Sequence, residues 1–328
     1  PPYYAIYGEI CLWLGEYQRC IDVIQEFMNE QVYTNRSQAK FLRGAWLLGK
    51  FSDFWSDNTY YNYEVASAIS YDSNNRQTNN LLKHFDSESP NEYWLAPSQA
   101  GMDRFSDETF IPLGTKEEDW RAGHTFGEQN GNYIICKFRT DTSKPAYEDD
   151  VRVFTYRGAD MYFMMAEAFN QLGENEEVLD ALINHGLSAY SDKFEVDADG
   201  VYSGTWNGFT PCWTGVKTNY LVNGAIEITT RGTNYTDLGI RGCDNFSVGE
   251  HPFTSDKQAN DEEILKEMMM EMSCEGKVYP ALIRMARRYN DPSFKGAWRS
   301  AIIAICDAAE RFSETKTGAL IVLERSTN

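Results

Sequence analysis

Two segments of this chain share one spacing of small and aromatic side chains, and that repeat constrains the fold more than any other feature. Each segment has the pattern of a helix, a turn at a glycine and a second helix, and the copies are 158 residues apart, counted from Gly15 to Gly173. Small residues, Gly8 and Ala166, occupy the positions where the two helices of each hairpin would press together. This is the tetratricopeptide spacing. Because such a hairpin cannot bury its apolar face alone, we expect both copies to belong to one packed, mainly helical body.

Further helices are predicted where apolar side chains recur at three- and four-residue intervals. Acidic side chains favour the amino end of a helix dipole, so we expect the run Asp261-Glu262-Glu263 to open one of them. The predicted segments are 37–54, the helix that opens at Asp261, 278–289 and 298–312.

Two long stretches have little periodicity and hold many aromatic residues among Asn, Asp, Ser and Gly. Loops of this length in a compact protein are usually functional. Short strands are predicted inside them, at 133–138 and within 218–230, and a last one at 319–323. We therefore expect one domain, 1–328, in five parts: a helical hairpin and a following helix at 1–55, a loop-rich ligand-facing region at 56–150, the second hairpin at 151–190, a glycine-rich insertion at 191–260 and carboxyl-terminal helices at 261–328.

Several side chains of the hairpins can be assigned an environment from their position in the pattern. Cys11 and Cys20 stand at packing positions, and we expect them in the core as small apolar residues. Asp160 and Glu167 are expected on the wetter side of the second hairpin. His185 falls on a packing position and is expected to be an interior side chain with its polar atoms satisfied.

A formal net charge of −19 argues against nucleic acid or an anionic membrane surface as the ligand, because both would be repelled over a Debye length. Neutral or cationic ligands remain. No run approaches the roughly 20 apolar residues that a membrane helix needs. The start of the chain lacks a methionine and a basic or apolar targeting segment, which indicates a fragment or a processed form.

The cysteine and histidine positions give little support for a metal site or a disulfide framework. Seven cysteines are scattered without a close pair. One disulfide, between Cys212 and Cys243, is a possibility that the sequence leaves undecided. The four histidines lack the helical spacing of a zinc site, and we expect no cofactor. Structural calcium held by loop carboxylates at Asp192, Asp197 and Asp199 stays open as well, although the run lacks the spacing of an EF-hand loop.

Several segments, in order, resemble the SusD/RagB family of nutrient-binding lipoproteins of Bacteroidetes outer membranes. They are the opening hairpin sequence at 5–17, the Pro-Ser segment at 94–105 with the Lys-Phe strand at 133–139, the helix at 153–168 with its Ala166-Glu167-Ala168 core, and the helix pair at 267–288 with Glu275-Gly276 and Leu282-Ile283-Arg284. The chain departs from the family pattern at Val278 and Ala281, where the family usually has arginine and aspartate. The departures put the ion pairing of the last helices in doubt. The family's common proline ending is also not visible after Ala319.

The resemblance implies a SusD-like fold of tetratricopeptide-type hairpins, long irregular loops and minor β structure. It implies a surface-exposed protein of the outer membrane that binds oligosaccharides or polysaccharides without catalysis. The partner would be a SusC-like TonB-dependent transporter, to which the glycan is delivered. The family's lipid anchor is an amino-terminal cysteine that this chain would lack, together with the family's amino-terminal third and part of the binding surface.

Sugar binding has a chemical signature that can be sought in the residues themselves. A pyranose ring stacks its C–H face on a flat aromatic side chain, and its hydroxyl groups need directional partners such as Asn, Asp, Gln and Arg. Aromatic residues beside short polar residues in the two loop regions are therefore the candidates: Trp55, Tyr60, Tyr61, Trp94, Trp206 and Trp213. The competing interpretation is that each ring fills an irregular core beneath a long loop, and the Pro-Ser neighbourhood of Trp94 looks structural in the family.

Three other functions stay open. A peptide-binding relative would favour a basic peptide at acidic loops. A helical glycosidase would need two carboxylates about 5 to 9.5 Å apart, and the candidates are Asp53 with Asp57, Asp149 with Asp150, and the 261–263 run, which is better explained as a helix start. A tetratricopeptide scaffold for protein partners would present a contiguous apolar groove instead of a polar aromatic patch.

Overall fold

The structure is a computed structural model in which side chains and backbone are described for most of the chain. The described residues are 3–34, 55, 65–106, 108–110, 115–117, 119, 121–139, 144–173, 175–185, 190, 193, 195–196, 202–203, 221–222, 225–230, 233–236, 239–241 and 250–289. The expected helices at 37–54 and 298–312, the strand at 319–323, the cysteine pair at 212 and 243 and the carboxylates at 192, 197 and 199 lie outside these ranges.

The two predicted hairpins are confirmed. Their elements are α1 (Tyr3–Leu14), α2 (Tyr17–Thr34), α6 (Gly158–Leu172), α7 (Glu176–Asp180) and the π-helical turn η4 (Ala181–His185). Gly15 and Gly173 both have positive φ, +77° and +88°, a conformation that glycine adopts at the end of a helix without a Cβ penalty. A Cβ at Gly8 would lie 3.0 Å from Cγ1 of Ile24, so α1 and α2 can approach this closely only because residue 8 has no side chain.

The remaining elements are two longer helices, α9 (Lys257–Glu271) and α10 (Val278–Tyr289), several short helices and helical turns, and short strands. The short helices and turns are α4 (Gln99–Ser106), α5 (Ala122–Thr125), η1 (Ser73–Asn75), η2 (Leu82–His84) and η3 (Ala146–Glu148). The strands are β1 (Val65–Ser70), β2 (Glu108–Phe110), β3 (Thr115–Glu117), β4 (Phe126–Gln129), β5 (Asn132–Ile135), β6 (Arg152–Arg157), β7 (Glu195–Val196), β8 (Tyr202–Ser203), β9 (Leu221–Val222), β10 (Ala225–Thr230) and β11 (Thr233–Thr236). All described pairings are antiparallel: β1 with β6, β2 with β3, β4 with β5, β7 with β8, and β10 with both β9 and β11.

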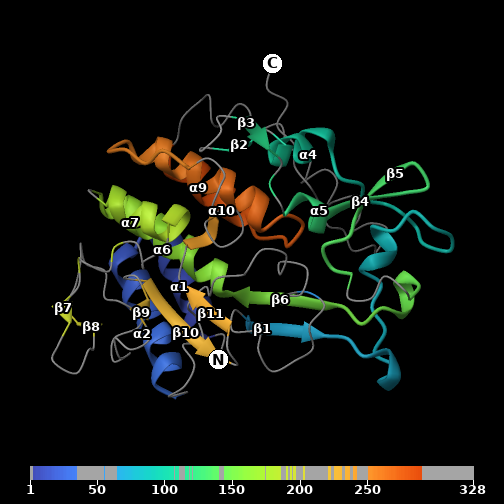
Figure 1. Ribbon diagram of the computed structural model, residues 1–328, viewed down its shortest axis with the longest axis horizontal. Helices are drawn as coiled ribbons and strands as arrows, with labels where there is room; N and C mark the ends of the chain where they lie inside the picture. The colour runs from blue at the N-terminus through green and yellow to red at the C-terminus, as the bar shows by residue number, and fades with distance from the viewer. Residues whose placement is uncertain are drawn as a thin grey trace.

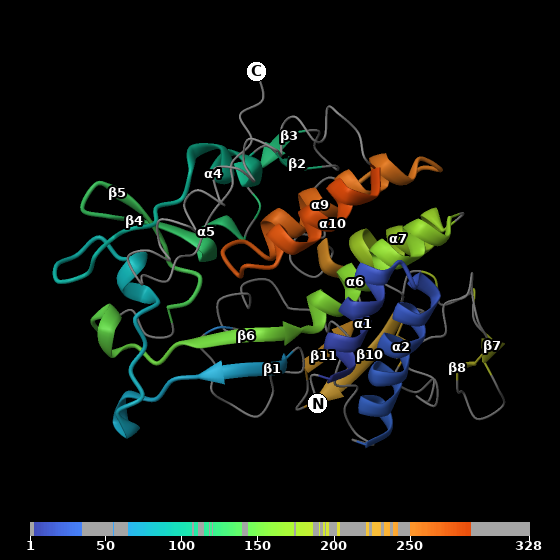
Figure 2. The same cartoon turned by 180° about the vertical axis from the view of Figure 1, so that it is seen from behind.

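The helices and the loop-rich parts occupy different sides of the molecule. Helices α1, α2, α6, α7, α9 and α10 gather on one side, while β6 leads into α6 from the other side, where the β4–β5 hairpin projects (Figure 1). Seen from behind, α1 and α2 lie in front of α6 (Figure 2). The main core lies among these helices and includes Cys11 and Cys20, which are buried as expected and carry free thiols. None of the described helices is both long and apolar enough to cross a membrane.

The sequence placed the start of α9 four residues too late. The helix begins at Lys257, and the carboxylate of Asp256 accepts hydrogen bonds from the backbone N–H groups of Gln258 and Ala259. A side-chain acceptor at this position satisfies amide groups that have no partner within the helix. Asp261 is therefore in the helix interior, where it is buried and accepts a hydrogen bond from Arg288.

The expectation that Asp160 and Glu167 face water is wrong. Glu167 is buried and ion-paired with Arg284 and Arg288, both at 2.5 Å, so α10 is tied to α6 although Val278 and Ala281 depart from the family pattern. Burial alone would raise the pKa of Glu167, but the hydrogen bond and charge of Arg284 hold it below its ordinary value. Asp160 is also buried, and its carboxylate accepts the N–H of Arg157 at the start of α6.

A second set of buried charges fixes the carboxyl end of α9. Its side chains, none more than 4% exposed, are Arg121, Lys137, Arg157, Arg241, Asp119, Glu267, Glu271 and Glu275, and we call them the buried charge network. Arg121 lies at its centre, with Nη2 2.6 Å from Asp119 and Nη1 2.6 Å from Glu267 and 2.9 Å from Glu271. Burial would raise the pKa of Glu267, but the guanidinium groups of Arg121 and Arg241 keep it well below its ordinary value. The network joins four separate parts of the chain to α9.

His185 is not the interior side chain that its position predicts. Its side chain is 42% exposed and lies between two carboxylates, with Nδ1 2.7 Å from Asp180 and Nε2 2.9 Å from Glu250. Because both ring nitrogens face acceptors, the arrangement suits a protonated imidazole that donates two hydrogen bonds. A metal ligand would instead keep one nitrogen for the ion.

We expect the imidazole of His185 to titrate with a pKa of about 9, because the hydrogen bond to Asp180 and the charge of both carboxylates outweigh partial burial. The folded pKa lies above the unfolded value of about 6.5, so the stabilisation is complete below that pH and is lost as the pH rises through about 9. NMR titration of the histidine ring protons measures this directly. Asp180→Asn should move the midpoint toward neutrality. A wild-type midpoint near 6.5 would contradict the position of His185 between the two carboxylates.

Candidate functional site

The six aromatic residues singled out in the sequence fall into three groups. Trp94 is exposed, with 56% of its surface accessible, while Trp55 is buried. Tyr60, Tyr61, Trp206 and Trp213 lie outside the described residues, so their roles stay predictions.

The expectation that Trp55 offers its ring to a sugar is wrong for this structure. Only 2% of the residue is exposed, and its ring packs against Phe138 and Phe154, with centroids 5.3 and 4.6 Å away. Two cations of the buried charge network, Lys137 and Arg157, lie 5.3 and 5.9 Å from the ring centroid. Trp55 therefore fills the smaller core under β1 and β6, which is the competing interpretation from the sequence.

Trp94 lies on a surface where aromatic and polar groups meet. The ring of His84 stacks on one face of the indole, with centroids 4.8 Å apart and planes inclined by 26°. Nδ1 of His84 lies 3.7 Å from the carboxylate of Glu92. His84 stacks on the indole, and the residue still keeps 56% of its surface accessible.

The backbone holds this segment firmly in place. The N–H groups of Glu92 and Tyr93 both donate to the carbonyl of Lys83, at 2.9 and 3.0 Å, and Leu95 N–H donates to the carbonyl of His84 at 2.9 Å. Tyr93 has a φ of +45°, which is uncommon for a residue with a side chain. The phenol of Tyr93 donates a hydrogen bond to the carbonyl of Tyr133.

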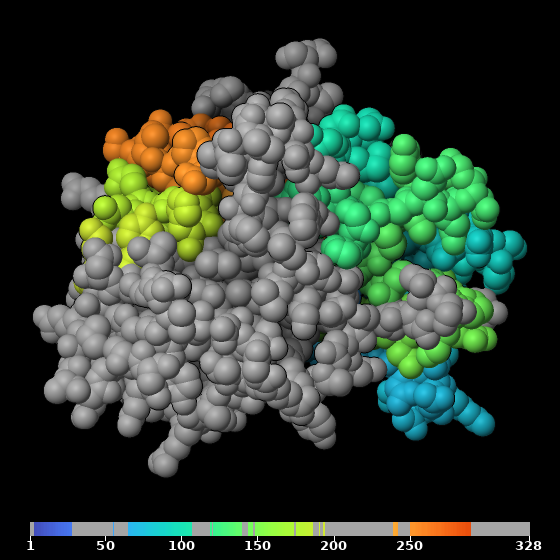
Figure 3. All heavy atoms as spheres, viewed as in Figure 1, coloured from blue at the N-terminus to red at the C-terminus, as the bar shows by residue number. Residues whose placement is uncertain are grey.

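The β4–β5 hairpin supplies a second exposed ring. Asn130 and Gly131 have φ of +54° and +76° at its tip, as a tight hairpin turn requires. Gln129 accepts hydrogen bonds from the backbone and the hydroxyl of Ser87, so the hairpin is joined to the Trp94 segment. Tyr133 is 53% exposed. Figure 3 shows the atoms of this green hairpin at the surface, on the right-hand side of the view.

We call His84, Glu92, Tyr93, Trp94 and Tyr133 the Trp94 surface. Sequence reasoning included Trp94 but missed His84 and Tyr133 as part of it. The dipeptide Asn130-Gly131 between alternating residues is a strong hairpin signal and could have placed Tyr133 near an exposed tip. Nothing local to His84 indicates that its ring would stack on a residue ten positions later.

The surface combines an exposed aromatic ring with carboxylate, imidazole and phenol groups, which can supply the stacking and the directional hydrogen bonds that a pyranose ring needs. Three of the carboxylates considered for glycosidase chemistry have structural roles instead. Asp149 is buried 3.5 Å from Nε of Arg139, and Asp150 accepts the N–H of Ser73. Asp261 pairs with Arg288, and its pKa is raised to about 6 mainly by burial.

Comparison with known proteins identifies the fold type. No family model matches the sequence, and no curated protein matches it either. Among solved structures, the chain is similar to the crystal structure of a SusD superfamily protein from Bacteroides vulgatus, with a TM-score of 0.53 and 16% sequence identity. The match covers 90% of this chain and 55% of the solved one, so the chain spans about half the length of that relative. With its two tetratricopeptide-type hairpins and this similarity over most of its length, the chain has a mainly helical, SusD-like fold.

Proposed function

We propose that this protein binds an oligosaccharide or polysaccharide at the Trp94 surface and releases it chemically unchanged. The observation that carries the proposal is the exposed indole of Trp94 with the ring of His84 stacked on it. Glu92 lies near that histidine, and the exposed Tyr133 belongs to the hairpin to which Tyr93 and Ser87 are hydrogen-bonded. The SusD-like fold supports a nutrient-binding role. A preformed surface binds without the entropy cost of ordering a loop, which suits weak, repeated contacts along a glycan.

The same fold supports a place for this role in the cell. We propose that the protein acts at the outer-membrane surface as a lipid-anchored protein and delivers its glycan to a SusC-like TonB-dependent transporter. Copurification of such a transporter with the full-length native protein tests this part, and its failure leaves the binding proposal to be judged by its own experiment.

Trp94→Ala is expected to weaken binding of the glycan by about tenfold or more, the equivalent of about 1.4 kcal/mol, because the indole supplies the stacking face. The stability of the fold should change little, because the ring is already exposed to water. Titration calorimetry with the glycan and thermal unfolding of the same sample measure both quantities. Tyr133→Ala should give a smaller loss of affinity.

The chain contains a matched control in Trp13, an exposed tryptophan on α1 with Arg284 over its ring. Trp13→Ala should leave glycan affinity within twofold of the wild type. If Trp94→Ala bound the glycan as tightly as the wild type, the Trp94 surface would not be the binding site. Binding of a basic peptide in place of any glycan would favour the peptide alternative, and cleavage products after long incubation would contradict a purely binding role.

A further inference from the structure

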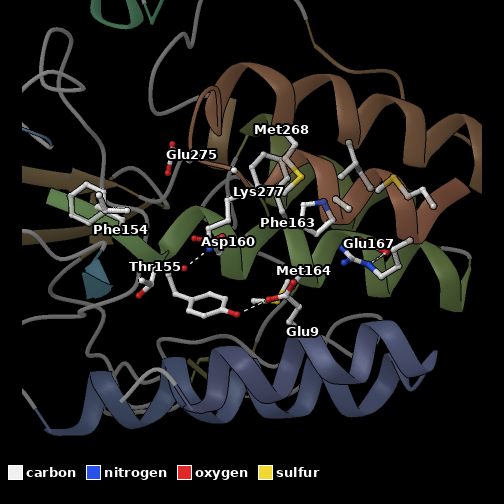
Figure 4. Close-up of a pocket in the computed structure, with 18 residues that line it drawn as sticks. Glu9, Phe154, Thr155, Asp160, Phe163, Met164, Glu167, Met268, Glu275 and Lys277 are labelled. Carbon is white, nitrogen blue, oxygen red and sulfur yellow. Dashed lines mark hydrogen bonds and ion pairs between the residues drawn. The ribbon is translucent and has the colours of Figure 1, made fainter. Parts of the chain in front are cut away.

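A cavity of about 380 Å³ lies between α1, β6, α6, α9 and α10, away from the Trp94 surface. Figure 4 shows that its lining combines apolar side chains, among them Phe163, Met164 and Met268, with the polar side chains of Glu9, Asp160 and Lys277, and that Met164 lies beside Glu9. Met285 of α10 adds a further thioether. Methionine side chains adapt their shape to apolar ligands, so this wall can accept chains of different lengths.

The cavity already holds one ammonium group in a specific way. Nζ of Lys277 lies 3.3 Å from Oδ1 of Asp160 and 4.2 Å from the centroid of the Tyr156 ring, and it donates a hydrogen bond to the carbonyl of Thr155. A carboxylate, an aromatic face and a carbonyl are the partners that an alkylammonium group uses in proteins. Lys277 occupies these three partners, so a second ammonium group would need a different carboxylate of the lining.

The other charges of the lining are matched, with one exception. Glu167 is held by two arginines of α10, and Glu275 by Arg157 and Lys137. Glu9 differs from them. Its carboxylate accepts a hydrogen bond from the phenol of Tyr156 at 2.5 Å. The guanidinium of Arg284, which is bound to Glu167, acts on Glu9 through its charge, but these two described side chains form no ion pair with each other.

We propose that this cavity binds a primary aliphatic amine, with its ammonium group on the carboxylate of Glu9 and its hydrocarbon chain among Phe163, Met164, Met268 and Met285. An anionic ligand would be repelled by Glu9, and a neutral alcohol would gain only the apolar contact. The formal net charge of −19 attracts cations in general. The amine comes either as a free small molecule or as the side chain of a lysine in a peptide, and both present the same chemistry.

The first test is calorimetry with n-butylamine, n-hexylamine, n-hexanol and hexanoate at pH 7. Hexylamine should bind more tightly than butylamine by about fourfold for each added methylene that is buried. It should also bind at least tenfold more tightly than hexanol, and hexanoate should not bind. Equal affinities for hexylamine and hexanol, or tighter binding of hexanoate, would overturn the proposal. N-acetyl-lysine methylamide serves as the peptide arm, and binding by it as well as by hexylamine identifies a lysine side chain as an acceptable source.

The location is tested by methionine methyl NMR, because only three of the ten methionines line the cavity. Hexylamine should shift the methyl signals of Met164, Met268 and Met285 and leave Met102 unchanged. Shifts at other methionines alone would place the binding elsewhere and refute the assignment.

Glu9→Gln should lower hexylamine affinity at least tenfold and leave hexanol affinity unchanged, whereas Glu16→Gln, the same change at an exposed position outside the cavity, should affect neither. Tyr156→Phe keeps the ring and removes the phenol that Glu9 accepts, so it should bind hexylamine as well as the wild type or better. This second variant decides the question if Glu9→Gln does not fold. A tenfold loss in Tyr156→Phe would contradict the role of Glu9 as the ammonium partner.

Discussion

Arg121→Met is expected to lower the free energy of unfolding by about 3–5 kcal/mol, because it removes the cation that three buried carboxylates share. The guanidinium lies within 2.9 Å of Asp119, Glu267 and Glu271, and none of these side chains is exposed. Methionine fills much of the space, so the loss would come from charge rather than from a cavity. Denaturant unfolding monitored by circular dichroism measures the change.

Arg287→Met is the matched control, since Arg287 is exposed in the last turn of α10. That variant should lie within about 0.5 kcal/mol of the wild type. Arg121→Lys should fall between the two, because an ammonium keeps the charge but not the planar fork that reaches several carboxylates at once. Equal stability of Arg121→Met and the wild type would show that the buried charge network does not hold α9 in place.

Trp55→Ala is expected to cost about 3–5 kcal/mol of stability, the range found when a large buried aromatic side chain is removed. The ring contacts Phe138 and Phe154 and lies beneath two cations, so its loss opens a cavity in the smaller core. Denaturant unfolding again supplies the number. Trp55→Phe should lose less, because it retains part of the packing.

Comparison of Trp55→Ala with Trp94→Ala tests directly whether the buried tryptophan is structural and the exposed one binds the glycan. Trp55→Ala should destabilise the fold, and Trp94→Ala should weaken glycan binding without destabilising it. The assignment is contradicted if Trp55→Ala folds with wild-type stability and fails to bind the glycan.

Local sequence patterns predicted the parts of this fold that depend on local spacing. The hairpin turns at Gly15 and Gly173, the close contact at Gly8 and helix α10 are all confirmed. A start signal for α9 was also present at Asp256, a good helix-capping residue, but the acidic run at 261–263 drew the prediction to a later position.

The environments of individual side chains were predicted less well, because partners distant in the sequence decide them. Glu167 is buried because Arg284, 117 residues later, neutralises it. Helical periodicity alone cannot show such a partner. Trp55 and Trp94 have similar local surroundings in the sequence, and only the packing of Phe138 and Phe154 on Trp55 distinguishes a core ring from an exposed one.

The most direct test of glycan binding at the Trp94 surface is retardation of the protein in native gels that contain a panel of polysaccharides. Wild type, Trp94→Ala and Trp13→Ala are run side by side. We expect at least one polysaccharide to retard wild type and Trp13→Ala while Trp94→Ala, folded by circular dichroism, migrates freely. Retardation of all three proteins to the same extent, or of none by any polysaccharide, would contradict it.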